Sequence, residues 1–338
     1  APMDPNNLPS PIASVGPNIG SYDDSNVVGG NVYYYRVGVI KGGSEVIGEE
    51  QKLDAFNFTL VTGSINDVKS IDIDGNEIWT LKAHTSYVQG IAIDSSGNVY
   101  SGSNDYTVKK INSDGNEIWT FTGHTNAVYN VAIDSSGNVY SASTDDTVKK
   151  IDSSGNEVWT FNGHTSSVYC VAVDSNTGNV YSGSNDEKVK KIDSSGNEVW
   201  TFKGHTKGVF SLAVDSSGNV YSASNDDTVK KIDSSGNEVW TFNGHNDIIR
   251  SVFVDSNGNI YSASDDNTVK KIDSSGNEAW SFTGHTDQPQ AVSVDSNEYV
   301  YSVAKDNTLR KIDPSGNEVW TFTGHTNPIY GVAVYLDY

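Results

Sequence analysis

Short runs of apolar and aromatic residues alternate with polar turns along most of this 338-residue chain. The segment 124–163 shows the pattern: "AVYNVAID", "VYSAS", "TVKKID" and "EVWTF" are separated by "SSGN", "TDD" and a second "SSGN". Runs rich in Val, Ile, Tyr, Thr and Trp between such turns are typical of β-hairpins. The glycine of each "SGN" is expected to adopt a positive φ. The pattern predicts four antiparallel strands in each unit.

This unit recurs every 40 residues, except that Thr177 adds one residue to a single turn. Each copy carries one histidine and, near the end of the unit, one tryptophan. The tryptophans are Trp79, Trp119, Trp159, Trp200, Trp240, Trp280 and Trp320. Four strands in about 40 residues form one blade of a β-propeller.

The two ends of the array predict the number of blades. Residues 57–81 contain three strands, six complete periods follow in 84–324, and a single first strand remains after His325. Three strands from one end and one from the other make a seventh blade, which removes the open sheet edges of a linear array. We therefore predict an all-β fold, a seven-bladed β-propeller over residues 56–338 whose first blade is closed by the C-terminal strand.

Several motifs in the repeats resemble WD-repeat propellers: the Gly-His pair, the "VxxVAxD" strand, and "SGSND" followed by "TVKKID". In that family a histidine before the first strand, a Ser or Thr of the second strand and an Asp of the next turn share hydrogen bonds. The resemblance implies a structural network of His84 with Asp105, His124 with Asp145, His164 with Asp186, His205 with Asp226, His245 with Asp266, and His285 with Asp306.

The repeats depart from the WD pattern at one point. The Trp-Asp dipeptide of that family is replaced by Ile-Asp, as at Ile151 and Asp152, so the network lacks its fourth member. The tryptophan lies instead in the fourth strand, in "GNEVWTF", which is similar to quinoprotein-type (PQQ-like) propellers. In that family such tryptophans lock neighbouring blades together, and the resemblance implies the same role here.

The N-terminal residues follow a different pattern. "SYDDSNVVGGNVYYYRVGVIKGGSEVIGEEQKL" resembles the last three strands of a fibronectin type III domain, whose first half is missing. We predict an extended, Pro-rich segment over residues 1–12 and a partial fibronectin-like β module over residues 13–55. The missing strands would come from a preceding segment or from a partner chain.

Charge narrows the range of partners. A formal net charge of −21 disfavours nucleic acid and anionic membranes, because a polyanion would be repelled. No apolar run approaches the roughly 18 residues of a membrane-spanning helix. The single cysteine, Cys170, excludes an intrachain disulfide.

The sequence argues against a zinc site, a catalytic triad and calcium-binding loops. The histidines lie on separate blades, so they do not converge as zinc requires, and no metal site is expected. The Ser, His and Asp of each blade match a catalytic triad in composition, but seven copies indicate a structural role. Turns such as "DIDGNE" (Asp72 to Glu77) resemble calcium loops, yet most copies lack the middle acid, so calcium is the less favoured alternative.

A quinone cofactor is also not expected. PQQ carries three carboxylates and needs cationic partners, whereas the propeller contains only Arg250 and Arg310 as arginines, and no repeat departs from the others as a catalytic blade would. We therefore predict neither a cofactor nor an enzyme. In each third strand a Lys-Lys pair is expected to face the Glu of the fourth strand, for example Lys150 beside Glu157.

Comparison of the repeats with one another indicates where binding occurs. The "SSGN" turns hardly vary, whereas the turn after Gly-His ("TSYVQG", "TNAVYN", "TSSVYC") and the turn between the second and third strands ("NDYT", "TDDT", "NDEK") differ in every copy. Alternate hairpins point the same way, so the two variable turns define one variable face of the disc. Relaxed drift on a solvated face is the competing explanation.

One position of the variable face follows the leading Val or Ile of each first strand, where it should surround the mouth of the central channel. Its residues are Gln89, Tyr129, Tyr169, Phe210, Arg250, Gln290 and Tyr330. Four aromatic residues and an arginine match the composition of binding hot spots.

The sequence therefore predicts a non-enzymatic binding or structural protein. Our first hypothesis is a surface appendage or virion (phage tail or head) component, outside the cell, that binds a host receptor, a glycan or a partner protein through the variable face. The N-terminal module would then contact other virion or surface subunits. An intracellular, cytoplasmic WD-type interaction scaffold is the alternative, and a quinoprotein-like enzyme is less favoured.

Overall fold

The computed structural model describes residues 32–35, 38–41, 44–47, 51–54 and 58–336. The chain forms two compact units, Ala1–Phe56 with Tyr338, and Asn57–Asp337. In the first unit two antiparallel pairs are present, β1 with β4 and β2 with β3. Their bounds are β1 (Val32–Tyr35), β2 (Gly38–Lys41), β3 (Ser44–Ile47) and β4 (Gln51–Asp54). The predicted extended segment 1–12 and residues 13–31 of the predicted module lie outside the described residues, and the fibronectin-like assignment stays a prediction.

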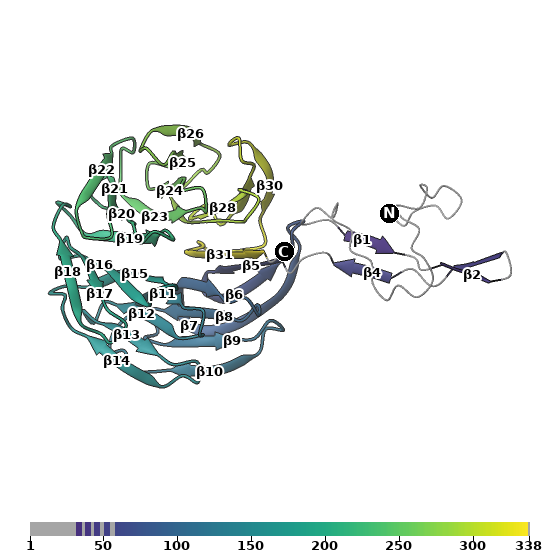
Figure 1. The fold of residues 1–338 in the computed structure, drawn as a ribbon, viewed down its shortest axis with the longest axis horizontal. Helices are drawn as coiled ribbons and strands as arrows, with labels where there is room; N and C mark the ends of the chain where they lie inside the picture. The colour runs from purple at the N-terminus through teal and green to yellow at the C-terminus, as the bar shows by residue number, and fades with distance from the viewer. Residues whose placement is uncertain (1–31, 36–37, 42–43, 48–50, 55–57, 337–338) are drawn as a thin grey trace. The chain divides into compact units, whose positions relative to one another are not determined.

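The second unit is a β-propeller, as predicted, and all regular elements among the described residues are strands (Figure 1). Five blades are separate four-stranded antiparallel sheets. Their strands are β11 (Val128–Ile133), β12 (Val139–Ser143), β13 (Val148–Ile151), β14 (Glu157–Phe161), β15 (Val168–Asp174), β16 (Asn179–Ser184), β17 (Val189–Ile192), β18 (Glu198–Phe202), β19 (Val209–Val214), β20 (Val220–Ser224), β21 (Val229–Ile232), β22 (Glu238–Phe242), β23 (Ile249–Val254), β24 (Ile260–Ser264), β25 (Val269–Ile272), β26 (Glu278–Phe282), β27 (Pro289–Val294), β28 (Val300–Ala304), β29 (Leu309–Ile312) and β30 (Glu318–Phe322). None of the described elements is a helix long and apolar enough to cross a membrane.

The first two blades share one sheet of order β10-β9-β8-β7-β6-β5-β31. Its strands are β5 (Phe58–Gly63), β6 (Ile65–Ile71), β7 (Glu77–Ile93), β8 (Val99–Ser103), β9 (Val108–Ile111), β10 (Glu117–Phe121) and β31 (Gly331–Leu336). The C-terminal β31 pairs antiparallel with β5, with Ala333 opposite Val61, so both ends of this unit contribute to the first blade (Figure 1). The inner strands β7, β11, β15, β19, β23, β27 and β31 contact one another in a closed ring.

Strand β7 differs from the expected pattern because it continues from the outer edge of the first blade into the inner position of the second. The turn expected after His84 is replaced by this 17-residue strand. The turn that follows β5 is one residue shorter than in the other blades, so β6 begins at Ile65 and pairs with Tyr87. This extra pairing holds 85–87 in extended conformation.

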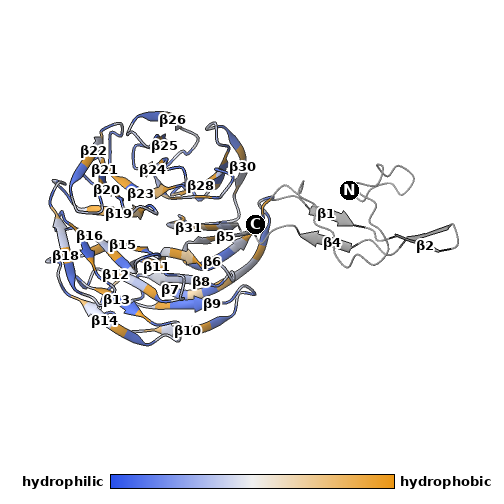
Figure 2. Ribbon diagram, viewed as in Figure 1, coloured by the Kyte–Doolittle hydropathy of each residue, from blue (hydrophilic) through white to orange (hydrophobic). Residues whose placement is uncertain are grey.

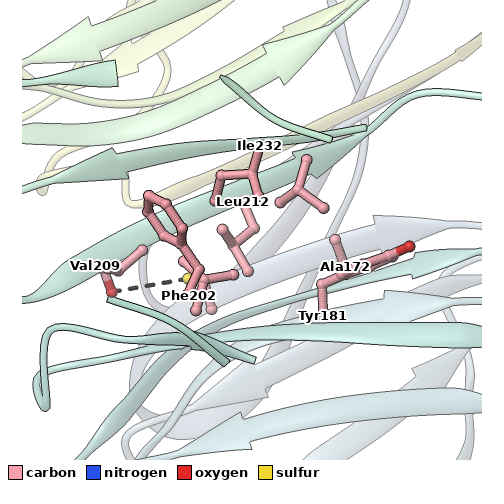
Figure 3. Close-up of a cluster of buried hydrophobic side chains, with 9 residues drawn as sticks. Ala172, Tyr181, Phe202, Val209, Leu212 and Ile232 are labelled. Atoms are coloured by element: carbon pink, nitrogen blue, oxygen red, sulfur yellow. Dashed lines mark hydrogen bonds between the residues drawn. The ribbon is translucent and has the colours of Figure 1, made fainter. Parts of the chain in front are cut away.

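The hydrophobic core lies between consecutive blades. In the blade of residues 128–161 the second strand is fully buried, whereas the fourth strand begins with exposed residues and ends with the buried Phe161. Apolar and polar residues are interspersed along the strands of the propeller (Figure 2). In one cluster Cys170 and Tyr181 of one blade pack against Val209, Leu212 and Ile232 of the next (Figure 3). Each blade therefore buries its apolar face only through its neighbours, which makes ring closure a condition of stability.

The tryptophans join the blades, as the quinoprotein-type resemblance implied. Each indole Nε1 donates to a backbone carbonyl in the third-to-fourth-strand turn of the next blade, as Trp119 does to Ser153 at 3.2 Å. The acceptors of Trp79, Trp119, Trp159, Trp200, Trp240, Trp280 and Trp320 are Ser113, Ser153, Ser194, Ser234, Ser274, Pro314 and Ile73. Gly155 has a φ of 91°, and a Cβ there would lie 3.1 Å from Trp119. Glycine thus serves both the turn and the close approach of the indole.

The expected pairing of Lys150 with Glu157 is wrong by one residue. The Glu157 carboxylate accepts from Lys149 Nζ at 3.0 Å, while Lys150 Nζ lies 5.4 Å from the centre of the Tyr140 ring. A bulge at Val158 places Ile151 opposite Glu157 and Lys150 opposite Trp159. Because successive side chains point to opposite faces of a sheet, the bulge brings the other lysine to the glutamate.

Candidate binding site at the channel mouth

The seven inner strands enclose a central channel of about 510 Å³, which lies within the roughly 300–1,000 Å³ typical of small-molecule sites. All seven residues predicted to surround its mouth line this channel, and together they are called the channel mouth below. They are Gln89, Tyr129, Tyr169, Phe210, Arg250, Gln290 and Tyr330. Residues far apart in the sequence are therefore brought together in the way that comparison of the repeats predicted.

A β-bulge explains why this position differs from its neighbours in the inner strands. In β11, Val128 pairs with Ser143 and Asn130 with Ala142, so Tyr129 has no cross-strand partner. The same irregularity occurs at the equivalent residue of β7, β15, β19, β23 and β27. Bulges redirect side chains at the rims of barrels and beside binding sites. Here the bulged residue needs no specific side chain for pairing, so it is free to vary.

Aromatic side chains form a continuous sector of the mouth on neighbouring blades. The rings of Tyr129 and Tyr169 are 5.1 Å apart, and those of Tyr169 and Phe210 are 4.7 Å apart and nearly parallel, with an interplanar angle of 5°. Tyr330 makes an edge-to-face contact at 5.4 Å with Tyr87. Tyr87 was not among the predicted residues; its signal is that only this copy has an aromatic side chain just before the leading Val or Ile.

A polar sector occupies the next two blades. Arg250 Nε donates to both oxygens of Asp265 at 3.0 Å, Nη2 donates to Oδ2 at 2.5 Å, and the guanidinium carbon lies 5.0 Å from the centre of the Phe210 ring. The Asp265 side chain is only 4% exposed. Gln290 Nε2 donates weakly to Asp265 Oδ1 at 3.5 Å and to the Gln288 carbonyl at 3.2 Å. Sequence reasoning missed Asp265, although it is the only acid at the first position of the variable "NDYT"-type turns.

Burial keeps Tyr169 and Tyr330 of the mouth protonated, because it raises the pKa of both phenols. Burial raises the pKa of Tyr169, with a further contribution from the nearby Tyr129. Burial also raises the pKa of Tyr330, which is close to Tyr87. A protonated phenol both donates and accepts a hydrogen bond. Of the described residues that line the channel, Arg250 alone carries a charge, and Asp265 compensates it.

The predicted histidine–aspartate pairs lie beneath the variable turns. His124 Nδ1 is 2.8 Å from Asp145 Oδ2, and Nε2 is 2.7 Å from the hydroxyl of Ser141. The same Asp145 accepts from the Thr125 amide at 3.0 Å and from the Thr147 hydroxyl at 2.6 Å. Equivalent histidine–aspartate contacts link His84 with Asp105, His164 with Asp186, His205 with Asp226, His245 with Asp266, and His285 with Asp306.

These contacts give the network a structural role. Burial would raise the pKa of Asp145, but hydrogen bonds from His124 and Thr147 outweigh it and hold the pKa well below its usual range. Ser141 is completely buried, so its hydroxyl does not meet a substrate as a catalytic nucleophile must. The threonine of the network was missed by sequence reasoning, although "DDT" or "DNT" occurs in several copies.

The seventh histidine, His325, departs from this arrangement. Its Nε2 lies 2.7 Å from Thr62 Oγ1, which takes the place of the serine. The turn of the first blade, "SINDV" at 64–68, is one residue shorter than "STDDTV" at 143–148 and has lost the partner aspartate. Burial lowers the pKa of His325 to about 4, with a further contribution from the positive charge of Lys69.

The described residues offer little to a metal ion or to a quinone cofactor. They contain no group of three or more His, Cys, Asp or Glu side chains placed to bind a metal. The Asp72 carboxylate of the calcium-like turn accepts from the amides of Asp74 and Asn76, at 3.0 and 2.7 Å, which is how it shapes the turn. Arg250 is paired with Asp265 and Arg310 with Glu318, so neither arginine is available to a tricarboxylate. The residues present do not fit PQQ.

Comparison with known proteins agrees with the tryptophan pattern. A family model described as outer membrane protein assembly factor BamB, of the PQQ-like repeat type, matches residues 65–183 and 185–321. No curated protein sequence gives a significant match. The WD-repeat resemblance stays a prediction, since the matching model is of the PQQ-like type. The chain belongs to the PQQ-like β-propeller family described as outer membrane protein assembly factor BamB.

Proposed function

We propose that this protein is a non-enzymatic binding propeller whose partner docks at the channel mouth on the variable face. The observation that carries the proposal is a contrast between positions. Docking tryptophans and the residues of the "SSGN" turns repeat almost unchanged, whereas the channel mouth carries four aromatic side chains, one arginine and two glutamines. Aromatic residues and arginine dominate the hot spots of binding surfaces.

Within this function we propose a surface or virion protein, such as a phage tail or head component, that binds a receptor, glycan or partner protein outside the cell. Two features of the sequence support it. The blades are nearly identical, which suits a part that changes by amplification of repeats, and residues 13–55 resemble a fibronectin type III module. The N-terminal module would then contact other subunits of the same assembly.

An interaction scaffold is the second candidate. The description of the matching family names an outer membrane protein assembly factor, which favours a role in binding other proteins. A cytoplasmic scaffold of WD type would use the same face. A quinoprotein-like enzyme is the least favoured, because the two arginines of the propeller are already paired with carboxylates.

The decisive experiment compares two triple variants on the same three blades. The mouth variant is Tyr129→Ala, Tyr169→Ala and Phe210→Ala. The rim variant changes Val158, Val199 and Val239 to Ala, each of which is 54% exposed on an outer strand. Both remove apolar surface from the same blades, so a difference between them reports on the position and not on general stability.

Binding of the purified full chain is measured against host cells, cell-wall fractions and glycan arrays, with circular dichroism to confirm folding. We expect the mouth variant to lose binding by about tenfold or more and the rim variant to bind like the wild type, since hot-spot side chains each contribute at least about 1–2 kcal/mol. Unchanged binding by a folded mouth variant would rule out the channel mouth as the site.

A further inference from the structure

The two sectors of the channel mouth differ in chemistry, and the difference restricts the ligand. Tyr129, Tyr169 and Phe210 form the aromatic sector, and Tyr330 with Tyr87 forms a separate aromatic pair on the other side of Gln89. The polar sector consists of Arg250, Asp265 and Gln290. We infer that the channel mouth binds an uncharged carbohydrate. This inference rests on the proposed function, because it assigns a ligand class to the same surface.

The aromatic sector offers a surface that is already ordered. Tyr129, Tyr169 and Phe210 come from three consecutive blades and contact one another, and Arg250 covers the Phe210 ring. A pyranose ring has faces made largely of C–H groups, which aromatic rings bury well. Because the rings hold each other in place, binding costs little side-chain entropy. An ordered aromatic surface thus suits a rigid, flat ligand of this kind.

The polar sector favours hydroxyl groups over ionic groups. Nε and Nη2 of Arg250 face Asp265, whereas Nη1 has no hydrogen-bond partner among the described residues. An anionic ligand would compete with Asp265 for a cation that is already paired, and it would approach a chain of net charge −21. A cationic ligand would meet Arg250 at the mouth. A hydroxyl can accept from Nη1 and also donate to a glutamine or tyrosine oxygen.

The channel below the mouth supports the same conclusion. Its wall combines aliphatic residues such as Ile133 and Val214 with neutral polar residues such as Asn130 and Ser211, and Arg250 is the only charged residue of the described lining. The serines also link neighbouring inner strands, as Val252 N donates to Ser211 Oγ at 3.0 Å. A lining without charge beyond Arg250 favours an uncharged ligand, and because the aromatic rings and Arg250 lie at the mouth, a terminal sugar residue is the part recognised.

The experiment uses the full chain on an array that carries neutral glycans, sialylated, sulfated and uronate-containing glycans, proline-rich peptides and basic peptides. The best ligand is then titrated by calorimetry. We expect binding to neutral glycans only, with an affinity that is nearly unchanged between about 50 mM and about 500 mM NaCl, because an uncharged ligand is not subject to ionic screening.

Two substitutions at one position separate stacking from folding. Tyr169→Phe keeps the ring and is expected to bind within about threefold of the wild type, whereas Tyr169→Leu is expected to lose about tenfold or more. The rim variant described above controls for stability. Arg250→Gln is expected to weaken binding without extending it to acidic glycans, because it also leaves Asp265 unpaired.

The outcomes distinguish this inference from the proposed function. Binding of acidic glycans or of either peptide class that is lost in the mouth variant would overturn the carbohydrate assignment and leave the binding site in place. Neutral-glycan binding that persists in Tyr169→Leu and in the mouth variant would overturn both. Neutral-glycan binding lost in Tyr169→Leu and kept in Tyr169→Phe supports both.

Discussion

The histidine of the closing blade should make the propeller sensitive to acid. His325 is buried beside Thr62 and lacks the aspartate that each of its six counterparts contacts. Burial, with a smaller contribution from the positive charge of Lys69, lowers its pKa from 6.5 to about 4. The blade that contains His325 joins the two ends of the propeller through β5 and β31. A proton on this side chain therefore acts on the closure of the ring.

The sign and size of the effect follow from proton linkage. The folded state holds the His325 proton less tightly than the unfolded chain, so the stability due to this group is complete above pH about 6.5 and is lost as the pH falls towards about 4. One pKa unit corresponds to about 1.4 kcal/mol, so the whole difference amounts to about 3 kcal/mol, of which about 2 kcal/mol is lost by pH 5. A loss of this size is a large fraction of the stability of most domains.

The assay is urea unfolding at pH values from 7.5 to 4, followed by tryptophan fluorescence, since the indoles lie at the blade junctions. The difference in unfolding free energy between wild type and His325→Gln should shrink by about 3 kcal/mol over this range, because glutamine does not titrate. Val158→Ala changes an exposed, non-titrating residue of an outer strand, so it is the control and should keep the acid sensitivity of the wild type. Equal pH dependence of wild type and His325→Gln would refute the reasoning.

Two further predictions concern the turns. Gly155→Ala and Gly137→Ala place a side chain at φ values of 91° and 77°, and each should lose about 1–3 kcal/mol from backbone strain. Gly155→Ala should lower the unfolding free energy, measured by chemical denaturation, more than Gly137→Ala does. The reason is that a Cβ at Gly155 would lie 3.1 Å from the docking Trp119, whereas the nearest atom to a Cβ at Gly137 is 3.5 Å away. Equal losses would contradict the docking role. In the intact chain Asp174 accepts from Thr177 at 2.5 Å, and the buried Tyr181 hydroxyl has no partner among the described residues. Deletion of Thr177 should free Asp174 to accept from Tyr181 and so raise the unfolding free energy by about 1–3 kcal/mol. A lower urea midpoint after this deletion would show that the inserted residue is needed for the turn.

Much of the propeller could be read from the sequence because its stabilising contacts repeat with the period of the chain. Each tryptophan docks on the next blade and each of six histidines contacts its aspartate at a constant offset, apart from the one extra residue that Thr177 adds and the contact of Trp320 with Ile73 across the ring closure. A contact that recurs at a constant sequence separation leaves a periodic signature, even without other sequences for comparison. The residues of the channel mouth were found by the complementary signal, a fixed position whose residue type changes from copy to copy.

The details that the sequence did not predict depend on single-residue displacements. The bulge at Val158 exchanges the two lysines, so that Lys149 and not Lys150 meets Glu157. Periodicity cannot reveal a bulge that occurs in every copy, because all copies shift together. Tyr87 and Asp265 each occur in a single copy, and the importance of each depends on a contact that periodicity does not show: Tyr87 meets Tyr330 of the neighbouring blade, and Asp265 meets Arg250 of its own blade.

Repeated residues and variable residues occupy different positions in each blade, and this determines what a substitution at the channel mouth can affect. The bulged side chains at the mouth make no cross-strand pairs, and the networks that hold the neighbouring turns use buried Ser, His and Asp side chains. A substitution at the mouth therefore alters what the site can bind while leaving the docking tryptophans and the buried His-Asp networks intact. Because each of six networks supports its own blade, the cost of one unfavourable change stays local. The closing blade is the exception, since His325 and the pairing of β5 with β31 have no second copy elsewhere in the described ring.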